Sequence, residues 1–228
     1  MHHACRRASK SSGGAVAGNK EVHMNQFKSI RELGKVRNTA RNQDSMLVTS
    51  RRYHSPDAAN KEEWAAHAMK HDMDRALLRD EDKGLLAQVE TQSVPEITEE
   101  AIITLWQSIP RQHQANAVFY MNVVTHNKLM DKFRDSPYHL MSSDRTYGFQ
   151  LLNKPIVFSN DMPCGNHSNE VLIQYGDFGQ VEVLQQGTDP VQEHECITFP
   201  GTVEVSMDGY AQVRLLDRQA VKGLRVTG

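Results

Sequence analysis

Two histidines are the first residues of this chain that could do chemistry. His67 and His71 stand four residues apart, which is the spacing of two metal ligands on one face of a helix. The residues between them are Ala68, Met69 and Lys70, so the glutamate of the HExxH motif of zinc hydrolases is missing. A solvated helix face explains this polar pattern more simply than a metal site does.

Four further side chains could contribute to a zinc site. His194 and Cys196 alternate on an expected strand, and Cys164 and His167 share an expected loop. Their spacing matches no zinc finger or zinc ribbon. A metal-dependent hydrolase that joins His194 and Cys196 to the helical histidine pair stays an alternative hypothesis, which stoichiometric zinc in the purified protein would support.

Motifs of other enzyme classes are missing from the sequence. There is no GxSxG nucleophile elbow, no P-loop and no GxGxxG fingerprint. Glu99 and Glu100 are adjacent, so they point in different directions on a helix and fit charges of a first turn. Asp177 could be a catalytic carboxylate, but a turn aspartate that accepts backbone N–H groups is the simpler interpretation. The sequence therefore predicts a protein that is not an enzyme and has no cofactor or bound metal.

A long amphipathic helix would carry the histidine pair. Apolar side chains recur at helical spacing from Trp64 to Leu77, which predicts a helix over Lys61–Arg79. Asn60 is the expected N-cap, with Glu63 completing a capping box. Because Trp64 belongs to the apolar stripe, we expect it to pack or to make contacts rather than to stack on a ligand.

The remaining elements mix helices and strands. After a linker at Ser93–Glu96, the sequence predicts helices capped by Thr98 and Thr125, with a central strand at Ala117–Met121 between them. Several strands follow, and Asp208-Gly209 is a hairpin signal. Since helices and strands do not alternate strictly, the predicted class is α+β.

Length and cysteine content set broad limits on the protein. A chain of 228 residues fits one large domain or two small ones. Its 3 cysteines, which include Cys5, are far apart and show no CxxC spacing, so we expect free thiols in a reducing compartment. No apolar run approaches the roughly 20 residues that span a membrane, so no membrane partner is expected.

Charge is distributed unevenly along the chain. Residues 1–60 hold 11 Lys or Arg against 4 Asp or Glu, a net of +7, while the remainder holds 15 against 24, a net of −9. Residues 26–55 have too few apolar side chains for a core of their own, so we interpret them as an extended arm that becomes ordered only against another surface. The alternatives are a disordered leader and a small nucleic-acid-binding module that acts through this basic tail.

A series of short motifs over residues 60–228 resembles, in its order, the major capsid proteins of tailed bacteriophages (Hong Kong 97 type). Each fragment is weak alone, but together they cover some 170 residues. The fragments are the helix that starts at Glu63-Trp64, the helix and strand of Ile97–Asn122, Leu151–Ser159 with Asn153 where the family often has glycine, Met162-Pro163, Gly176-Asp177-Phe178, and the terminal Asp217, Ala220 and Leu224.

The resemblance implies a Hong Kong 97-like α+β capsid fold with four parts. Residues 1–59 would be a basic N-terminal arm and extended loop, and residues 60–97 a spine helix and linker of the peripheral domain. Residues 98–180 would form the axial domain, joined by the final strand, and residues 181–228 would hold the peripheral strands and the closing C-terminal element. The family usually has a longer region before the spine helix, so we expect a shortened loop or an incomplete prophage copy.

The resemblance also implies a structural phage head protein that assembles with copies of itself. Hexamers and pentamers would form a shell around double-stranded DNA without sequence specificity, with scaffold or portal proteins as further partners. The protein would belong to the virion and be assembled in the host bacterial cytoplasm. The residues that we expect at subunit contacts are Arg37, Arg41, Arg51, Arg52, Trp64, Asp80, Glu81 and Asp82.

Overall fold

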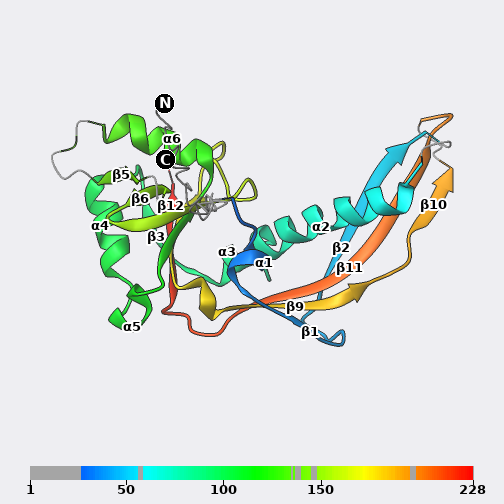
Figure 1. Ribbon diagram of the computed structural model, residues 1–228, viewed down its shortest axis with the longest axis horizontal. Coiled ribbons are helices and arrows are strands. Elements are labelled where there is room, and N and C mark those ends of the chain that lie inside the picture. The colour runs from blue at the N-terminus through cyan, green and yellow to red at the C-terminus, as the bar shows by residue number, and fades with distance from the viewer. Residues whose placement is uncertain are drawn as a thin grey trace, which may run out of the picture.

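The computed structural model shows an elongated molecule with two lobes (Figure 1). It describes residues 27–55, 59–134, 136, 140–144, 148–195 and 199–227. Each lobe is organised around one sheet, five-stranded in what we call the peripheral lobe and seven-stranded in the axial lobe. No helix among these residues is both long enough and apolar enough to cross a membrane.

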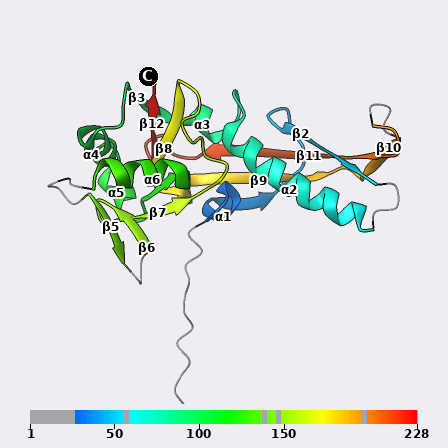
Figure 2. The ribbon, with the colours of Figure 1, turned by 90° about the horizontal axis from the view of Figure 1, so that it is seen from above.

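The peripheral lobe combines a twisted sheet with a long helix that lies along it. Figure 2 shows the strands running lengthwise through this lobe. Its elements are α1 (Ile30–Leu33), β1 (Lys35–Asn38), β2 (Met46–His54), α2 (Lys61–Arg79), α3 (Leu85–Gln88), β9 (Val181–Thr188), β10 (Gln192–Glu195) and β11 (Val203–Leu215).

Strand β11 is the backbone of the peripheral sheet. All 9 residues of β2 pair antiparallel along one edge of β11, while β10 and β9 pair with successive stretches of its other edge. The expected hairpin at Asp208-Gly209 is wrong, because β11 continues through both residues. Asp208 pairs with Thr49 of β2, so the strand does not turn at this point. The pairing with β9 shifts register next to Gly209, which makes the glycine part of an irregularity within β11.

Helix α2 forms where the apolar spacing predicts it. Its buried stripe includes Ala65, Met69, Met73 and Leu77, which face β2 and β11. The expected capping box is wrong: Asn60 takes a left-handed conformation, with φ of 62°, and its side chain makes no cap hydrogen bond. The helix is therefore held by burial of its stripe rather than by its cap.

The axial lobe packs three helices against a mixed sheet of order β3-β12-β8-β4-β7-β6-β5. The 3₁₀ turn η1 (Phe178–Gln180) leads from this lobe into β9. The elements are β3 (Glu90–Val94), α4 (Glu99–Gln107), α5 (Arg111–Gln114), β4 (Val118–Met121), α6 (Val123–Lys132), β5 (Met141–Asp144), β6 (Gly148–Leu151), β7 (Lys154–Phe158), β8 (Glu170–Gly176) and β12 (Val221–Val226).

Local signals placed most axial elements correctly. Thr98 caps α4 by accepting the Ala101 N–H, and the predicted central strand is β4. The predicted cap Thr125 is wrong, because Asn122 accepts the Val124 N–H and α6 already begins at Val123. Thr125 is instead buried inside the helix, so it faces the core rather than the helix end.

Sheet pairing divides the chain differently from the expected ranges. The expected linker at Ser93–Glu96 overlaps β3, which pairs in parallel with β12 and so belongs to the axial sheet. The final strand β12 lies between β3 and β8 in the same sheet. The axial lobe therefore takes strands from residues 90–94 and 221–226 as well as from the continuous middle of the chain.

Candidate functional site

The histidine pair of α2 lies on the surface and does not gather further ligands. His67 and His71 are both exposed. The ring of His71 lies near two aspartates, Asp72 at 3.5 Å and Asp161 at 3.9 Å. Among the described residues, no three His, Cys, Asp or Glu side chains converge in a geometry that could hold a metal ion.

The other candidate zinc ligands are dispersed. His194 is exposed on β10, at the far end of the peripheral lobe, while Cys164 and His167 lie in the axial loop between β7 and β8. Cys196 lies outside the described residues. The described part of the chain thus gives the hydrolase hypothesis no support.

The carboxylates considered for catalysis have structural positions. Asp177 Oδ1 accepts the Gly179 N–H at 3.0 Å, so the interpretation as a turn aspartate is confirmed. Glu99 and Glu100 lie in the first turn of α4, where their charge complements the helix dipole.

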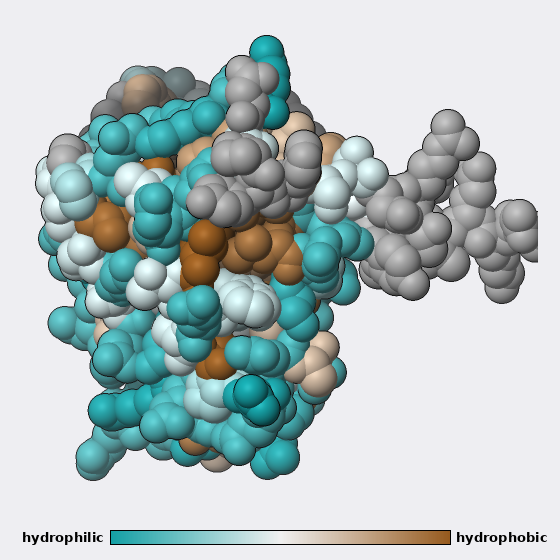
Figure 3. All heavy atoms as spheres, turned by 90° about the vertical axis from the view of Figure 1, so that its left-hand side faces the viewer, coloured by the Kyte–Doolittle hydropathy of each residue, from teal (hydrophilic) through white to brown (hydrophobic). Residues whose placement is uncertain are grey.

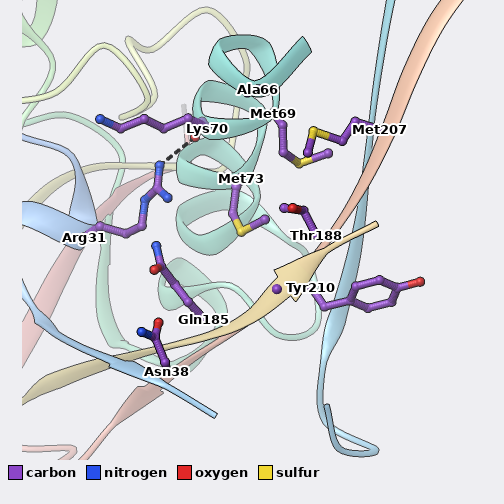
Figure 4. Close-up of a pocket in the computed structure, with 11 residues that line it drawn as sticks. Arg31, Asn38, Ala66, Met69, Lys70, Met73, Gln185, Thr188, Met207 and Tyr210 are labelled. Atoms are coloured by element: carbon purple, nitrogen blue, oxygen red, sulfur yellow. Dashed lines mark hydrogen bonds between the residues drawn. The ribbon is translucent and has the colours of Figure 1, made fainter. Parts of the chain in front are cut away.

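A groove of about 350 Å³ lies between α2 and the strands β9 and β11. Figure 4 shows Met69 and Met73 of α2 and Met207 of β11 at its floor. Arg31 reaches its rim, but the guanidinium is already bound to Asp74 and to the Lys70 carbonyl. The groove therefore offers apolar contact and a few amides, without a nucleophile and base that could act together.

Two of the four predicted contact arginines make ion pairs on the outer face of their own sheet. Arg37 lies 3.1 Å from Glu182, whose second oxygen is 3.2 Å from Arg214. Arg41 pairs with Asp189 at 2.5 Å and stacks over a tyrosine ring, with its Cζ 3.2 Å from the ring centroid of Tyr210.

The other two arginines also have partners within the chain. Arg51 lies 3.9 Å from Glu204, and Arg52 binds both carboxylate oxygens of Asp72 at 3.0 and 3.1 Å. Burial acts to raise the pKa of Asp72, but the neighbouring Ser50 hydroxyl and the hydrogen bonds from Arg52 outweigh it and hold the pKa below the ordinary value.

The interpretation of residues 26–55 as an arm that is ordered only against another surface is wrong for the described part. Lys28 is tied to the axial lobe through its backbone, which bonds the Phe158 carbonyl and accepts the Tyr120 hydroxyl. The strands β1 and β2 pair with β9 and β11 of the same chain. The segment lacks a core of its own because its apolar residues join the core under α2, as Met46 and Val48 do.

Four ring-bearing side chains lie at the free end of the peripheral lobe as two contact pairs on opposite faces of β2, and we call them the tip cluster: Tyr53, His54, Trp64 and Phe199. Trp64 is 60% exposed and Phe199 53%. The rings of His54 and Trp64 contact edge to face at 5.0 Å, and those of Tyr53 and Phe199 at 5.5 Å. The prediction found Trp64 but missed the other three, because β-strand pairing brings distant segments together.

The acidic run after α2 has a local structural role. Asp80 Oδ1 accepts the N–H groups of Asp82 and Lys83, so it shapes the turn that ends the helix. Glu81 and Asp82 are exposed and remain available for other contacts.

Apolar side chains also gather at the opposite end of the molecule. Figure 3 shows apolar residues in the centre of the axial end face, surrounded by polar ones. Exposed apolar residues of the axial lobe include Val124 and Met130 of α6 and Phe149 of β6. Both ends of the long molecule therefore present apolar surface, which marks interaction sites in soluble proteins.

Comparison with known proteins agrees with this architecture. A family model described as the phage capsid family matches residues 59–187, which is more than half of the chain. No curated protein matches the sequence. The capsid of an empty GTA particle is 15% identical, with a TM-score of 0.58, and the match covers 99% of this chain and 96% of that one.

Two further solved structures are similar. The holo-SrpI encapsulin complex from Synechococcus elongatus PCC 7942 has a TM-score of 0.56 at 13% identity, with 97% of this chain and 92% of that chain covered. Gordonia phage Cozz has a TM-score of 0.54 at 11% identity, with 81% and 70% covered. At such identities the likeness concerns the fold, and it confirms the Hong Kong 97-like α+β fold that the sequence predicted.

Proposed function

This chain belongs to the phage capsid family and is a structural capsid protein, and we propose that its copies associate as hexamers and pentamers of a closed shell around double-stranded DNA. The observation that carries the proposal is the family match over residues 59–187. An elongated molecule with apolar surface at both ends supports it, because each end can contact a neighbour and symmetry makes many modest contacts cooperative.

Subunit contacts at the tip cluster are part of this proposal. Exposed aromatic side chains dominate the binding energy of protein interfaces, and Trp64 is a large one with most of its surface free. Arg37, Arg41, Arg51 and Arg52 already have acidic partners in their own chain, so they would contact a neighbour through their exposed edges. Glu81 and Asp82 are acidic surface residues that could face such edges.

Enclosed DNA would be held without base recognition. Residues 1–60 carry a net charge of +7 in the sequence, and contacts between basic side chains and phosphates are independent of base sequence. Scaffold or portal proteins and assembly in a bacterial cytoplasm complete the proposal as partners and location. The hydrolase alternative has no supporting observation.

Electron microscopy of the full-length chain tests the proposal. The protein is expressed in bacteria, purified by sedimentation and imaged, and the nucleic acid that survives nuclease treatment is then extracted. Closed particles or capsomer rings with protected double-stranded DNA are expected. A chain that stays monomeric at high concentration would overturn assembly, whereas closed particles that contain only protein would overturn the DNA part alone.

A further inference from the structure

Two chain connections between the lobes run side by side. The first, Gly176–Gln180, leads from β8 into β9, and the second, Leu216–Ala220, leads from β11 into β12. The Asp177 N–H donates to the Ala220 carbonyl at 2.9 Å, and the Leu216 N–H donates to the Gln180 carbonyl at 2.9 Å. Backbone hydrogen bonds thus hold the two connections together, and we call this pair of connections the crossing.

Gly176 shows how closely the connections approach. Its φ is 158°, and a Cβ at this position would lie 2.1 Å from the Ala220 carbonyl oxygen. Only a residue without a side chain fits there. The two connections therefore cannot move closer together. A change in their relative position must then change the direction in which the peripheral sheet leaves the axial sheet.

The side chain of His113, in the axial lobe, contacts both connections. His113 of α5 is 7% exposed, with Nε2 2.9 Å from Asp217 Oδ2 and Nδ1 3.6 Å from Asp177 Oδ2. Each aspartate uses its other oxygen within its own connection, where Asp177 Oδ1 accepts the Gly179 N–H and Asp217 Oδ1 accepts the Gln219 N–H. We call His113, Asp177 and Asp217 the junction clasp.

The histidine is itself fixed to the axial lobe. Helix α5 follows Pro110, and the Gln114 side chain donates to the Ile109 carbonyl. The Gln114 carbonyl in turn accepts a hydrogen bond from Lys154 of β7. The imidazole therefore transmits the position of the axial body to both connections.

We propose that the junction clasp sets the angle between the two lobes, and thereby the curvature of the assembled shell. The effect on shell curvature rests on the proposed function, whereas the angle between the lobes is a property of the single chain. Loss of the clasp leaves the two backbone hydrogen bonds of the crossing and the apolar contacts of Phe178 and Ala220 with the peripheral core. These hold the connections together but define the angle less strictly, so the lobes then sample a wider range of angles. Subunits that hold different angles close into shells of different size.

Two variants and a matched control test the clasp. His113→Ala removes the bridging ring but leaves a cavity, so Asp217→Ala is the milder change: it removes the carboxylate that serves both His113 and Gln219 at a partly exposed position. Asp189→Ala is the control for the exchange experiment, because the Asp189 and Asp217 side chains are both 36% exposed and both are ion-paired, but Asp189 lies in the peripheral lobe away from the crossing.

Amide hydrogen exchange and particle diameter are the two readouts, both on the full chain. With Asp217→Ala, the Asp177 and Leu216 amides should exchange about tenfold faster, as expected for loss of a charge-assisted hydrogen bond, and the distribution of diameters should broaden. Asp189→Ala should leave both exchange rates unchanged. Wild-type exchange and wild-type diameters in both clasp variants would overturn the inference. If the unaltered chain forms no shells, the proposed function fails, but the exchange experiment still decides whether the clasp holds the crossing.

Discussion

Trp64 shows how sequence spacing can place a side chain on the wrong side of its helix. The apolar stripe predicted by spacing includes it, yet it is 60% exposed, while its neighbour Ala65 is buried against the sheet. A solvent-exposed indole contributes binding free energy when a partner protein buries it. Its edge contact with His54 keeps the ring oriented while leaving most of its surface free.

Replacement of this indole should separate assembly from folding. Trp64→Ala should change the free energy of unfolding by no more than about 0.5 kcal/mol, because the residue is on the surface. It should raise the concentration needed for assembly roughly thirtyfold, as for loss of an interface residue worth about 2 kcal/mol. Light scattering against concentration measures this. Trp64→Phe should recover part of the loss, and assembly of Trp64→Ala at the wild-type concentration would contradict the tip contact.

His126 is a buried titratable group in the axial lobe. It is 3% exposed, and its ring lies 4.7 Å from that of Phe149 and 5.1 Å from that of Phe158. Nε2 is buried without a hydrogen-bond partner among the described residues. Burial lowers the pKa of His126 from its ordinary value of 6.5, with a smaller opposing effect from the hydrogen bond to Asn127.

The sign of the resulting pH dependence follows from proton binding. The unfolded chain binds the proton more readily than the folded chain, so the stabilisation is present above pH 6.5 and is lost as pH falls through the lowered folded pKa. Wild-type urea midpoints should therefore decrease between pH 7 and pH 5. His126→Phe, which suits the aromatic surroundings, should flatten this decrease, while His167→Gln on an exposed loop should keep it. An unchanged slope in His126→Phe would exclude His126 as its source.

The contact between α2 and β11 depends on a glycine in the middle of a strand. A Cβ on Gly209 would lie 2.4 Å from the Met73 Cε and 2.8 Å from the Met69 Sδ. The flexible methionines thus fill the space that a side chain would take, and the helix approaches the sheet closely. This explains why a residue that weakens strands stands here.

A larger residue at this position should push the helix away from the sheet. Gly209→Val should destabilise the chain by about 1–3 kcal/mol, because it overpacks the core. Thermal unfolding of the single variant and of a double variant with Met73→Ala measures the coupling. The valine should cost less in the double variant, where the clashing Cε is gone, and equal costs would show that the strand rather than the helix contact is responsible.

At the scale of the whole molecule, strand pairing rather than charge decides where the chain can be shortened. Residues 27–55 supply β1 and β2, and β2 contributes Met46 and Val48 to the peripheral core. Deletion of residues 1–55 should therefore remove the peripheral lobe's cooperative unfolding. Circular dichroism against urea concentration, for this deletion and for the full chain, measures this. A cooperative transition at the same urea midpoint in both would contradict the contribution of β2 to the core.

Local interactions could be predicted from the sequence, whereas contacts between distant segments could not. Helix α2, the Thr98 cap and strand β4 follow from local spacing and capping chemistry, which a single sequence carries. The partners of Arg37, Arg41 and Arg51 and the junction clasp depend on pairing between segments more than 100 residues apart, such as Arg41 with Asp189 and His113 with Asp217. No local pattern marks His113, because its neighbours Gln112 and Gln114 form an ordinary polar turn. The axial sheet also takes β3 from the segment that was expected to link the spine helix to the axial domain, whereas the final strand joins it as expected. Parallel pairing of β3 with β12 has no signature in either segment.

The position of β12 has a consequence for synthesis on the ribosome. Among the described strands of the axial sheet, β3 lies at the edge and pairs with β12, and β12 pairs with β8 on its other side. Proteins emerge with their N-terminal residues first, so β3 and one edge of β8 stay without partners until residue 226 has been made. A nascent chain therefore cannot complete its axial lobe until β12 has left the ribosome.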